Sequence, residues 1–475
     1  MNTQFDVIII GCGVIGAAAA YELSRYDISI AVLERGNDVA MGATRANSGI
    51  IHAGYSSEPG SLMAKLNVEG ARLAKGICKD LDVPHRQCGS LVLAFSEDDI
   101  SVLERLLRSS EENAVPDVRI LDRETVLNME PNLSKGVAAA LYAPTAMIVS
   151  PWEYALALME TAVNNGARIN LECAVTGVEK TSAGYRLRTT SGDFEARYVI
   201  NAAGLYSDEI HNMAAEPAFT ILPSKGQYYL LDKSEGAHVS RVIFQCPAGS
   251  GKGVLIAPTV HGNLIVGPSS ERIADRDDVS STADGLEYVM NSARKAAPGI
   301  DFSANIRSFA GNRARTGNRD FIIREAAPGF IDLAGICSPG LSAAPAIAKM
   351  AAGMLEKSGL DLRAKRDFRA RREITRFHEL PPDEKAALVA SDPAYGRVIC
   401  RCETITEGEV RDALCGPIPP RSIDAVKRRT GAGSGRCQAG FCGPRVLNML
   451  ADHYSCKPTD ILQDGAGSFV LTSEI

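Results

Sequence analysis

The N-terminal residues alternate between two short apolar runs and a segment of small residues. Phe5 to Ile10 is rich in β-branched side chains, which predicts a strand buried on both faces. An alanine-rich segment running to about Arg25 predicts a helix, and the apolar run Ile28 to Leu33 predicts a second strand. This strand–helix–strand order is typical of a parallel sheet with a helix packed on it.

Apolar runs far along the chain repeat this pattern. Tyr198 to Gly204 predicts a strand that ends in small residues, and Phe330 to Ile336 predicts another. The turn Cys337 to Ser342 then leads into a small-residue helix, Ala343 to Met354. We expect the N-terminus of that helix to point at whatever lies beyond the strand end.

The length and composition indicate a folded protein of more than one domain. Pro223 to Leu230 and Gly262 to Pro268 predict strands of a second domain, separated by turn residues. A chain of 475 residues exceeds what one hydrophobic core usually organises, so two or three domains are expected. The hydrophobic share of 45% and the charged share of 23% are those of an ordinary globular protein, which argues against disorder.

The charge and hydropathy exclude several classes of partner. A formal net charge of −6 offers no positive field for nucleic acid or an anionic membrane. The apolar run Val7 to Ala20 follows Asp6 and is interrupted by glycines, unlike a signal peptide. No stretch reaches the roughly 20 apolar residues of a transmembrane helix. We expect a cytoplasmic protein without nucleic-acid partners, with any membrane association peripheral and made through partner proteins.

The first strand and helix are joined by a glycine pattern that carries chemistry. Gly11, Gly13 and Gly16 form G-x-G-x-x-G, and Glu34 ends the second strand 18 residues after Gly16. Gly11 permits a tight turn, Gly13 lets the backbone approach a pyrophosphate, and Gly16 allows close packing of helix and strand. The helix N-terminus then faces the pyrophosphate, and Glu34 would bind the adenosine ribose. This pattern predicts a dinucleotide site but does not separate FAD from NAD.

A polar, glycine-punctuated loop, Gly42 to Gly54, follows the second strand and suits contact with a cofactor. The chain resembles the D-amino-acid-oxidase-like flavoprotein superfamily over about residues 5 to 355. Four features in the family's order carry this resemblance: the glycine pattern, this loop, the strand end Asn201 to Gly204 and the turn Gly335 to Ser342. That superfamily includes glycerol-3-phosphate dehydrogenases and L-2-hydroxyglutarate dehydrogenases. The resemblance implies FAD, with the Gly340 helix start facing the flavin pyrimidine ring. It also implies cofactor contacts by Thr44, Arg45, Asn47, Ser48, Gly49, Val175, Ala203, Gly204, Gly311, Gly335, Gly340, Leu341 and Ser342.

The same resemblance implies a substrate site. Ser308 to Arg313 looks like the segment that returns to the FAD domain and whose arginine binds the substrate's anionic group. A guanidinium pairs bidentately with a carboxylate or phosphate, which suits Arg313 to this role. His52 is the candidate base for the substrate hydroxyl proton as hydride leaves for flavin N5, with structural packing as the alternative. Lys225 would add a positive charge near the flavin, or be a solvated strand lysine.

Six of the twelve cysteines crowd into the last 76 residues, which favours a metal site over disulfides. Cys400 and Cys402, then 34 residues, then Cys437 and Cys442 give a C-x-C…C-x4-C set. The arrangement resembles the bacterioferritin-associated-ferredoxin-like [2Fe-2S] domain over about residues 396 to 462, which implies these four cysteines as cluster ligands. Four thiolates would also suit one zinc ion, although zinc ribbons usually show C-x2-C pairs.

Two short helices are expected between the cysteine pairs, Thr406 to Leu414 and Ser422 to Arg429. Cys415 and Cys456 fall outside the ligand pattern and are predicted to be buried thiols. Lys427 to Arg429 are predicted to form a solvated helix face, the alternative being that they offset the negative charge of the cluster.

The expected fold class is α/β: a Rossmann-like FAD domain interleaved with a mixed-sheet substrate domain, plus a small helical C-terminal iron–sulfur domain. The predicted limits are 1–75, 145–215 and 310–357 for the FAD-binding domain, 76–144 and 216–309 for the substrate domain, 358–395 for a connector and 396–462 for the [2Fe-2S] domain.

A flavin accepts a hydride and a [2Fe-2S] cluster accepts one electron, so the pair predicts substrate oxidation followed by electron export to redox partner subunits. The architecture resembles the large subunit of anaerobic glycerol-3-phosphate dehydrogenases, which implies oxidation of sn-glycerol 3-phosphate to dihydroxyacetone phosphate. The stretch His52 to Ser57 lacks an arginine typical of those enzymes, and Asn47 to Gly54 followed by Glu58 to Leu62 looks more like L-2-hydroxyglutarate dehydrogenases. L-2-hydroxyglutarate, or another 2-hydroxy or amino acid, is therefore an alternative small anionic substrate. An electron-transfer subunit with no substrate of its own is a third alternative.

Overall fold

The first sheet contains the predicted strand–helix–strand unit. The computed structural model describes residues 3–246 and 253–473. β1 (Gln4–Ile10), β12 (Phe194–Asn201) and β2 (Ile30–Leu33) are adjacent and parallel, and β20 (Phe330–Ala334) lies parallel to β12. The predicted strands are therefore confirmed as neighbours in one eight-stranded sheet. Its other strands are β9 (Arg168–Asn170), β10 (Val175–Thr181), β11 (Gly184–Thr189) and β19 (Ile322–Ala327).

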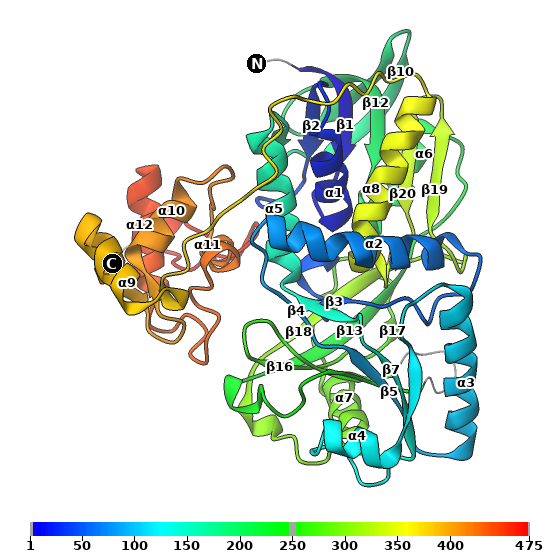
Figure 1. Cartoon of the computed structure of the whole chain (residues 1–475). Coiled ribbons are helices and arrows are strands. Elements are labelled where there is room, and N and C mark those ends of the chain that lie inside the picture. The colour runs from blue at the N-terminus through cyan, green and yellow to red at the C-terminus, as the bar shows by residue number, and fades with distance from the viewer. Residues whose placement is uncertain (1–2, 247–252, 474–475) are drawn as a thin grey trace.

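Helices of small residues cover this sheet (Figure 1). α1 (Val14–Leu23) buries its four consecutive alanines, and it packs against α5 (Pro151–Asn164) and α8 (Gly340–Lys357). Alanine and glycine let these helices approach one another closely, which is why the segment is apolar without being bulky. α2 (Leu62–Asp80) crosses α8, and α6 (Ser207–Ala214) follows β12.

The second large sheet has nine strands in mixed orientation, and it lies below the first sheet in Figure 1. α3 (Glu97–Glu112), α4 (Arg123–Met129) and α7 (Ala283–Ala296) pack on it. A small sheet of β3 (Ile50–Ile51), β8 (Met147–Val149) and β4 (His85–Gln87) lies between the two large sheets. The strands of the nine-stranded sheet are β5 (Ser90–Ala94), β6 (Arg119–Asp122), β7 (Ala139–Ala143), β13 (Leu222–Leu231), β14 (Val242–Gln245), β15 (Leu255–Pro258), β16 (Leu264–Gly267), β17 (Glu271–Arg272) and β18 (Asn305–Arg315).

One segment differs from its predicted place. We expected residues 308–313 to have returned to the FAD domain, but β18 pairs with β13 along its whole length, from Asn305 opposite Leu231 to Arg315 opposite Leu222. Three consecutive residues, Ala310 to Asn312, are buried where the strand pairs with β13, so the strand belongs to the second sheet. Its C-terminal half approaches the loop after β2, since a Cβ on Gly311 would lie 1.9 Å from the Ala46 carbonyl oxygen.

The C-terminal unit is small and mainly helical, and it lies beside α5 (Figure 1). It consists of β21 (Val398–Cys400), β22 (Ile405–Thr406), α10 (Glu407–Leu414), α11 (Ile423–Thr430) and α12 (Gly443–Tyr454) around an apolar core of its own. The predicted helices between the cysteine pairs are confirmed, the first with a complete Thr406–Glu409 capping box. An extended connector carrying α9 (Pro382–Ser391) joins it to α8.

Across the part of the chain that the structure describes, no helix is long and apolar enough to cross a membrane.

Candidate active site

The glycine turn after β1 has the geometry that its sequence demands. Gly11 has φ +96°, and a Cβ there would lie 2.6 Å from the carbonyl oxygen of Ala202. A Cβ on Gly16 would lie 2.0 Å from the carbonyl oxygen of Gly11, so this position serves helix–strand packing. A Cβ on Gly13 would meet only the Thr44 hydroxyl at 3.3 Å. Gly11 and Gly13 line a cavity of about 690 Å³ at the end of β1.

Glu34 lines the same cavity at the end of β2. Its carboxylate accepts hydrogen bonds from the Cys12 N–H at 2.7 Å and the Gly36 N–H at 2.8 Å. Burial raises the pKa of Glu34 above its ordinary value, although both backbone bonds act in the opposite direction. These bonds fix the acid at the cavity wall, where it can accept further hydrogen bonds from a ligand.

The cavity extends from the glycine turn to the start of α8. Pro339 precedes that helix without a side-chain cap, and Gly340 and Leu341 line the cavity. The positive end of an 18-residue helix therefore faces the space. The other predicted cofactor contacts that line it are Thr44, Asn47, Ser48, Val175, Ala203, Gly204 and Gly311. An elongated cavity with a glycine turn near one part and a helix start near another fits a dinucleotide such as FAD.

Other predicted cofactor residues lie outside the lining. Ser342 is fully buried and its hydroxyl accepts a hydrogen bond from the His52 N–H at 2.7 Å, so it supports the wall. Gly335 has φ +63° in the turn before α8. Gly49 lines a different cavity, and Arg45 bonds to Asp464 of the C-terminal segment.

Arg313 brings a half-buried cation to the cavity. Its Nη2 donates to the Ser269 carbonyl at 3.3 Å, whereas its Nη1 is buried and has no hydrogen-bond partner within residues 3–246 and 253–473. A Cβ on Gly226 of the neighbouring strand would lie 2.3 Å from Arg313 Nη2, so this glycine makes room for the guanidinium. An unpaired, buried N–H on a cation is costly, and an anionic ligand would satisfy it.

His52 lines the same cavity within an aromatic cluster. Its ring lies 4.5 Å from Tyr55 and 5.8 Å from Phe244, centroid to centroid. The Gly54 N–H donates to Nδ1 at 3.1 Å. When the Asn67 side-chain amide is oriented so that its nitrogen faces the His52 carbonyl, its oxygen also accepts from the Gly54 N–H at 3.0 Å. The neutral His52 ring in this geometry accepts at Nδ1 and carries its hydrogen on Nε2.

Lys225 is not brought together with His52 and Arg313. Its side chain is buried, it does not line the cavity, and its Nζ forms an ion pair with Asp278 at 2.7 Å. The lysine lowers the pKa of Asp278 well below its usual range. Its charge is therefore already balanced by a carboxylate.

The four predicted cysteine ligands lie in two pairs. Cys402 and Cys437 are 3.6 Å apart, sulfur to sulfur, and Cys400 interacts directly with Cys442. In the ranges 3–246 and 253–473, no three potential ligands surround one point closely enough for a single ion. Two thiol pairs suit a cluster of two irons better than one tetrahedral zinc ion. Cys415 was predicted to be buried but is exposed at the end of α10, and Cys456 is only partly buried.

A buried ion-pair network joins the C-terminal unit to the first sheet. Asp38, 1% exposed, accepts from Arg428 Nε at 2.9 Å and from Arg429 Nη2 at 2.8 Å. Burial by itself raises the pKa of Asp38, but the charges of Arg429 and Arg428 lower it below its ordinary value. Arg428 also binds Asp464, which bonds to Arg45. The prediction of a solvated face was therefore wrong for Arg428 and Arg429, because Asp38, remote in sequence, compensates their charges.

Asp38→Asn is expected to loosen the C-terminal unit, because the amide leaves the buried Arg429 without a countercharge and leaves Arg428 paired with Asp464 alone. Breaking a buried ion pair on one side typically costs ~3–5 kcal/mol. We expect a lower unfolding temperature and faster proteolysis in the connector, residues 358–395, with Asp383→Asn on exposed α9 as the control. Equal cleavage rates in both variants and wild type would show that the network does not hold this unit.

Comparisons with known proteins agree with this arrangement. The family model "FAD dependent oxidoreductase" matches residues 6–354, and the model "BFD-like [2Fe-2S] binding domain" matches residues 398–452. The chain thus belongs to the FAD-dependent oxidoreductase family and carries a C-terminal [2Fe-2S] binding domain.

Individual relatives place it more closely. The chain is 47% identical over 472 residues to a glycerol 3-phosphate dehydrogenase of Caloramator mitchellensis, covering 99% of this chain and 98% of the relative. It is 30% identical over 327 residues to the human mitochondrial L-2-hydroxyglutarate dehydrogenase, covering 64% of this chain and 70% of the relative. The FAD-bound L-α-glycerophosphate oxidase of Mycoplasma pneumoniae superposes with a TM-score of 0.75 at 31% identity, covering 78% of this chain and 99% of that structure.

Proposed function

We propose that the protein is an FAD-dependent dehydrogenase that oxidises sn-glycerol 3-phosphate to dihydroxyacetone phosphate and passes the electrons through its [2Fe-2S] domain to a protein partner. The observation that carries the substrate class is the buried, unpartnered Nη1 of Arg313 in the cavity that His52 also lines. The dehydrogenase from Caloramator mitchellensis supports the choice of substrate, because the similarity extends over both the flavin domain and the C-terminal domain.

The chain's own groups divide the work of the reaction. Bound FAD supplies a hydride acceptor, held by the glycine turn, Glu34 and the start of α8. Arg313 binds the phosphate through two parallel N–H bonds of its guanidinium. This contact positions the glycerol part of the substrate in the cavity. His52 is the group placed to take the C2 hydroxyl proton on Nε2. This step requires hydrogen on Nδ1, and the Gly54 N–H must then bond to Asn67 alone instead of to Nδ1. Tyr55 and Phe244 exclude water around the imidazole.

L-2-hydroxyglutarate is the second candidate substrate. The segment Tyr55 to Ser57 after His52 lacks the arginine expected of glycerol-3-phosphate enzymes, Asn47 to Gly54 followed by Glu58 to Leu62 resembles L-2-hydroxyglutarate dehydrogenases, and the human enzyme is 30% identical. A decayed pocket is disfavoured, because an electron-transfer subunit without a substrate gains nothing from keeping Nη1 of Arg313 buried without a hydrogen-bond partner.

Anaerobic reduction of the bound flavin distinguishes these candidates. We expect sn-glycerol 3-phosphate to bleach the flavin absorbance rapidly, and sn-glycerol 1-phosphate to fail, because only one enantiomer directs its C2 hydrogen at the acceptor when Arg313 holds the phosphate. Preferential reduction by L-2-hydroxyglutarate would replace the proposed substrate. Reduction by no member of a panel of hydroxy and amino acids would favour an electron-transfer subunit.

The partner would dock at the exposed side of the cysteine loop. Cys402 is exposed, and Phe441, next to Cys442, has 81% of its surface exposed to solvent. An exposed aromatic side chain beside a redox centre is a common anchor for a protein partner. A membrane-bound partner would associate this chain with the membrane peripherally.

A further inference from the structure

The four predicted cluster ligands have unequal surroundings. Cys400 and Cys442 are each 1% exposed and belong to the apolar core of the C-terminal unit, so the unit's own packing holds this inner pair. In the outer pair, Cys402 is exposed and Cys437 is only partly buried. The outer pair therefore needs a second source of order, because segments with little buried apolar contact open locally at small cost.

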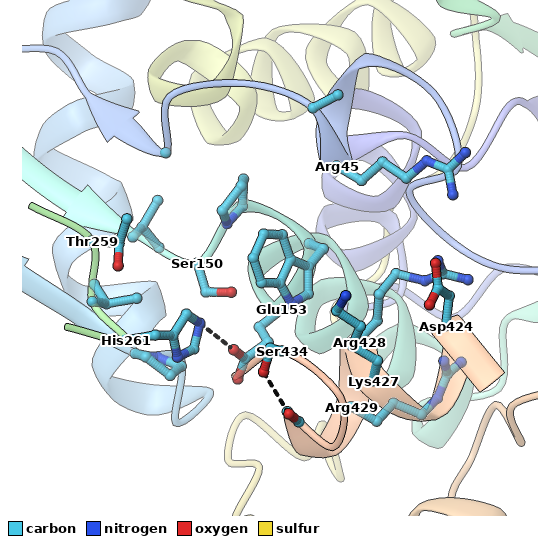
Figure 2. A pocket seen from close by; sticks show the side chains of 18 of the residues that line it. Arg45, Ser150, Glu153, Thr259, His261, Asp424, Lys427, Arg428, Arg429 and Ser434 are labelled. Carbon is cyan, nitrogen blue, oxygen red and sulfur yellow. Dashed lines mark hydrogen bonds and ion pairs between the residues drawn. The ribbon is translucent and has the colours of Figure 1, made fainter. Parts of the chain in front are cut away.

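A cavity of about 1390 Å³ lies between the C-terminal unit and the second sheet. Figure 2 shows Lys427 of α11 on one side of it, and Thr259 and His261 of the turn between β15 and β16 on the other. Lys233 of the second sheet and Glu403 of the C-terminal unit also line this cavity, and they form an ion pair. Because the two parts do not pack on each other across the cavity, such polar contacts gain importance.

Two ion pairs connect the outer cysteine pair to one turn of the second sheet. Lys233 Nζ lies 2.8 Å from Glu403 Oε2, and Arg436 Nε donates to Asp232 Oδ2 at 3.0 Å. Each partner on the C-terminal side is the direct chain neighbour of an outer ligand. The charges are reciprocal, since an acid and a base of the turn meet a base and an acid beside the two cysteines.

The turn that supplies these charges is itself fixed. Asp232 precedes η3 (Lys233–Glu235), and its Oδ1 accepts from the Ser234 N–H at 3.1 Å, which leaves Oδ2 for the guanidinium. A Cβ on Gly236 would lie 1.8 Å from the Gly262 carbonyl oxygen, so the turn packs directly on the neighbouring turn of the sheet. A fixed turn can hold a loop that docks on it.

The loops that carry the outer cysteines are close together and their carboxylate contacts are shielded. A Cβ on Gly435 would lie 2.3 Å from Cys402 Cβ and 2.8 Å from Glu403 Oε1. The side chains of Glu403 and Asp232 are only 15% and 14% exposed, whereas their cationic partners are more exposed. Shielding strengthens these pairs relative to pairs in open water, and the exposed cations leave them sensitive to salt.

We propose that Asp232 and Lys233 are positioning residues of the iron–sulfur site, which hold Cys402 and Cys437 in the geometry that the cluster needs. A [2Fe-2S] cluster is bound by four thiolates. The core of the C-terminal unit fixes the inner two, and the second sheet fixes the outer two through the ion pairs. The second sheet thus completes a site whose ligands all lie in another domain.

Iron release measures this role without any substrate, so the result does not depend on the proposed function. Asp232→Asn/Lys233→Gln removes both charges of the turn, and the introduced amide can still accept from the Ser234 N–H. We would follow the transfer of iron from the anaerobic holoenzyme to the neutral chelator bipyridine in low and in high salt. In low salt, release should be faster by about 1.4- to 5-fold for each exposed ion pair that is lost. High salt should speed release from the wild type but hardly from the variant, which lacks the charges that salt screens.

Further variants assign the effect to the ion pairs. Lys233→Glu should also speed release, and Lys233→Glu/Glu403→Lys should restore slow release by exchanging the charges. Glu195→Lys serves as the control, because it breaks an exposed pair with Arg186, 2.9 Å long, in the first sheet. The EPR spectrum of the dithionite-reduced cluster should broaden in Asp232→Asn/Lys233→Gln, and unchanged FAD content would verify folding. Iron release with the wild-type rate and salt dependence in this variant would overturn the proposal, as would fast release that the exchanged pair does not slow.

Discussion

Cys437→Ser is expected to leave flavin reduction by substrate at the wild-type rate and to abolish turnover with the protein acceptor. Hydride transfer needs only contact between the substrate and the flavin, whereas the proposed export through the C-terminal domain needs the cluster, for which Cys437 is one of four predicted ligands. Cys437 lies 3.6 Å from Cys402, sulfur to sulfur, so the substitution removes one member of a thiol pair. Three measurements on one preparation separate these effects. Iron and sulfide analysis gives the cluster content, stopped-flow flavin reduction gives the rate of hydride transfer, and steady-state turnover gives the rate of electron export.

Cys415→Ser provides the matched control. It makes the same chemical change in the same domain, but Cys415 is exposed at the end of α10, outside the predicted ligand set. We expect it to keep its iron and its turnover. A small dye that takes electrons directly from the flavin should still support activity in Cys437→Ser. Wild-type turnover with the protein acceptor after iron is lost would show that the domain has a structural role only.

Arg313→Ala is expected to weaken the binding of an anionic substrate while FAD stays bound. Removing one partner of a buried charge pair typically costs ~2–5 kcal/mol, about 30-fold to several thousand-fold in affinity. The affected group is the buried Nη1, for which residues 3–246 and 253–473 provide no partner. The dependence of the flavin reduction rate on substrate concentration gives the apparent affinity, and the absorbance ratio of flavin to protein gives the FAD content.

Arg319→Ala tests whether substrate binding depends on Arg313 in particular or on any arginine near it, since Arg319 is exposed in the turn after β18. It should bind substrate as the wild type does. Arg313→Lys should recover only part of the lost affinity, because an ammonium cannot make the bidentate pair. Unchanged affinity in Arg313→Ala would move the anion site elsewhere and remove the main observation behind the proposed substrate class.

The sequence by itself determined the elements whose signals are local. Apolar periodicity located β1, α1 and β2, and the glycine spacing identified the turn whose φ of +96° at Gly11 requires glycine. The cysteine spacing located the C-terminal module in the same way. These features are predictable because each depends on neighbours within a few residues, or on a backbone conformation that few residue types adopt.

Only the tertiary structure decided which charges meet. Lys225 is buried against Asp278, Arg45 bonds to Asp464, and Asp38 holds Arg428 and Arg429 from the other end of the chain. Local sequence cannot predict these pairs, because a basic run has the same pattern whether water or a distant carboxylate compensates it. The same reason left Gly226 unnoticed, since its role depends on the Arg313 side chain of the adjacent strand. The pairing of distant strands and units therefore decides which cations stay unpaired and can bind an anion.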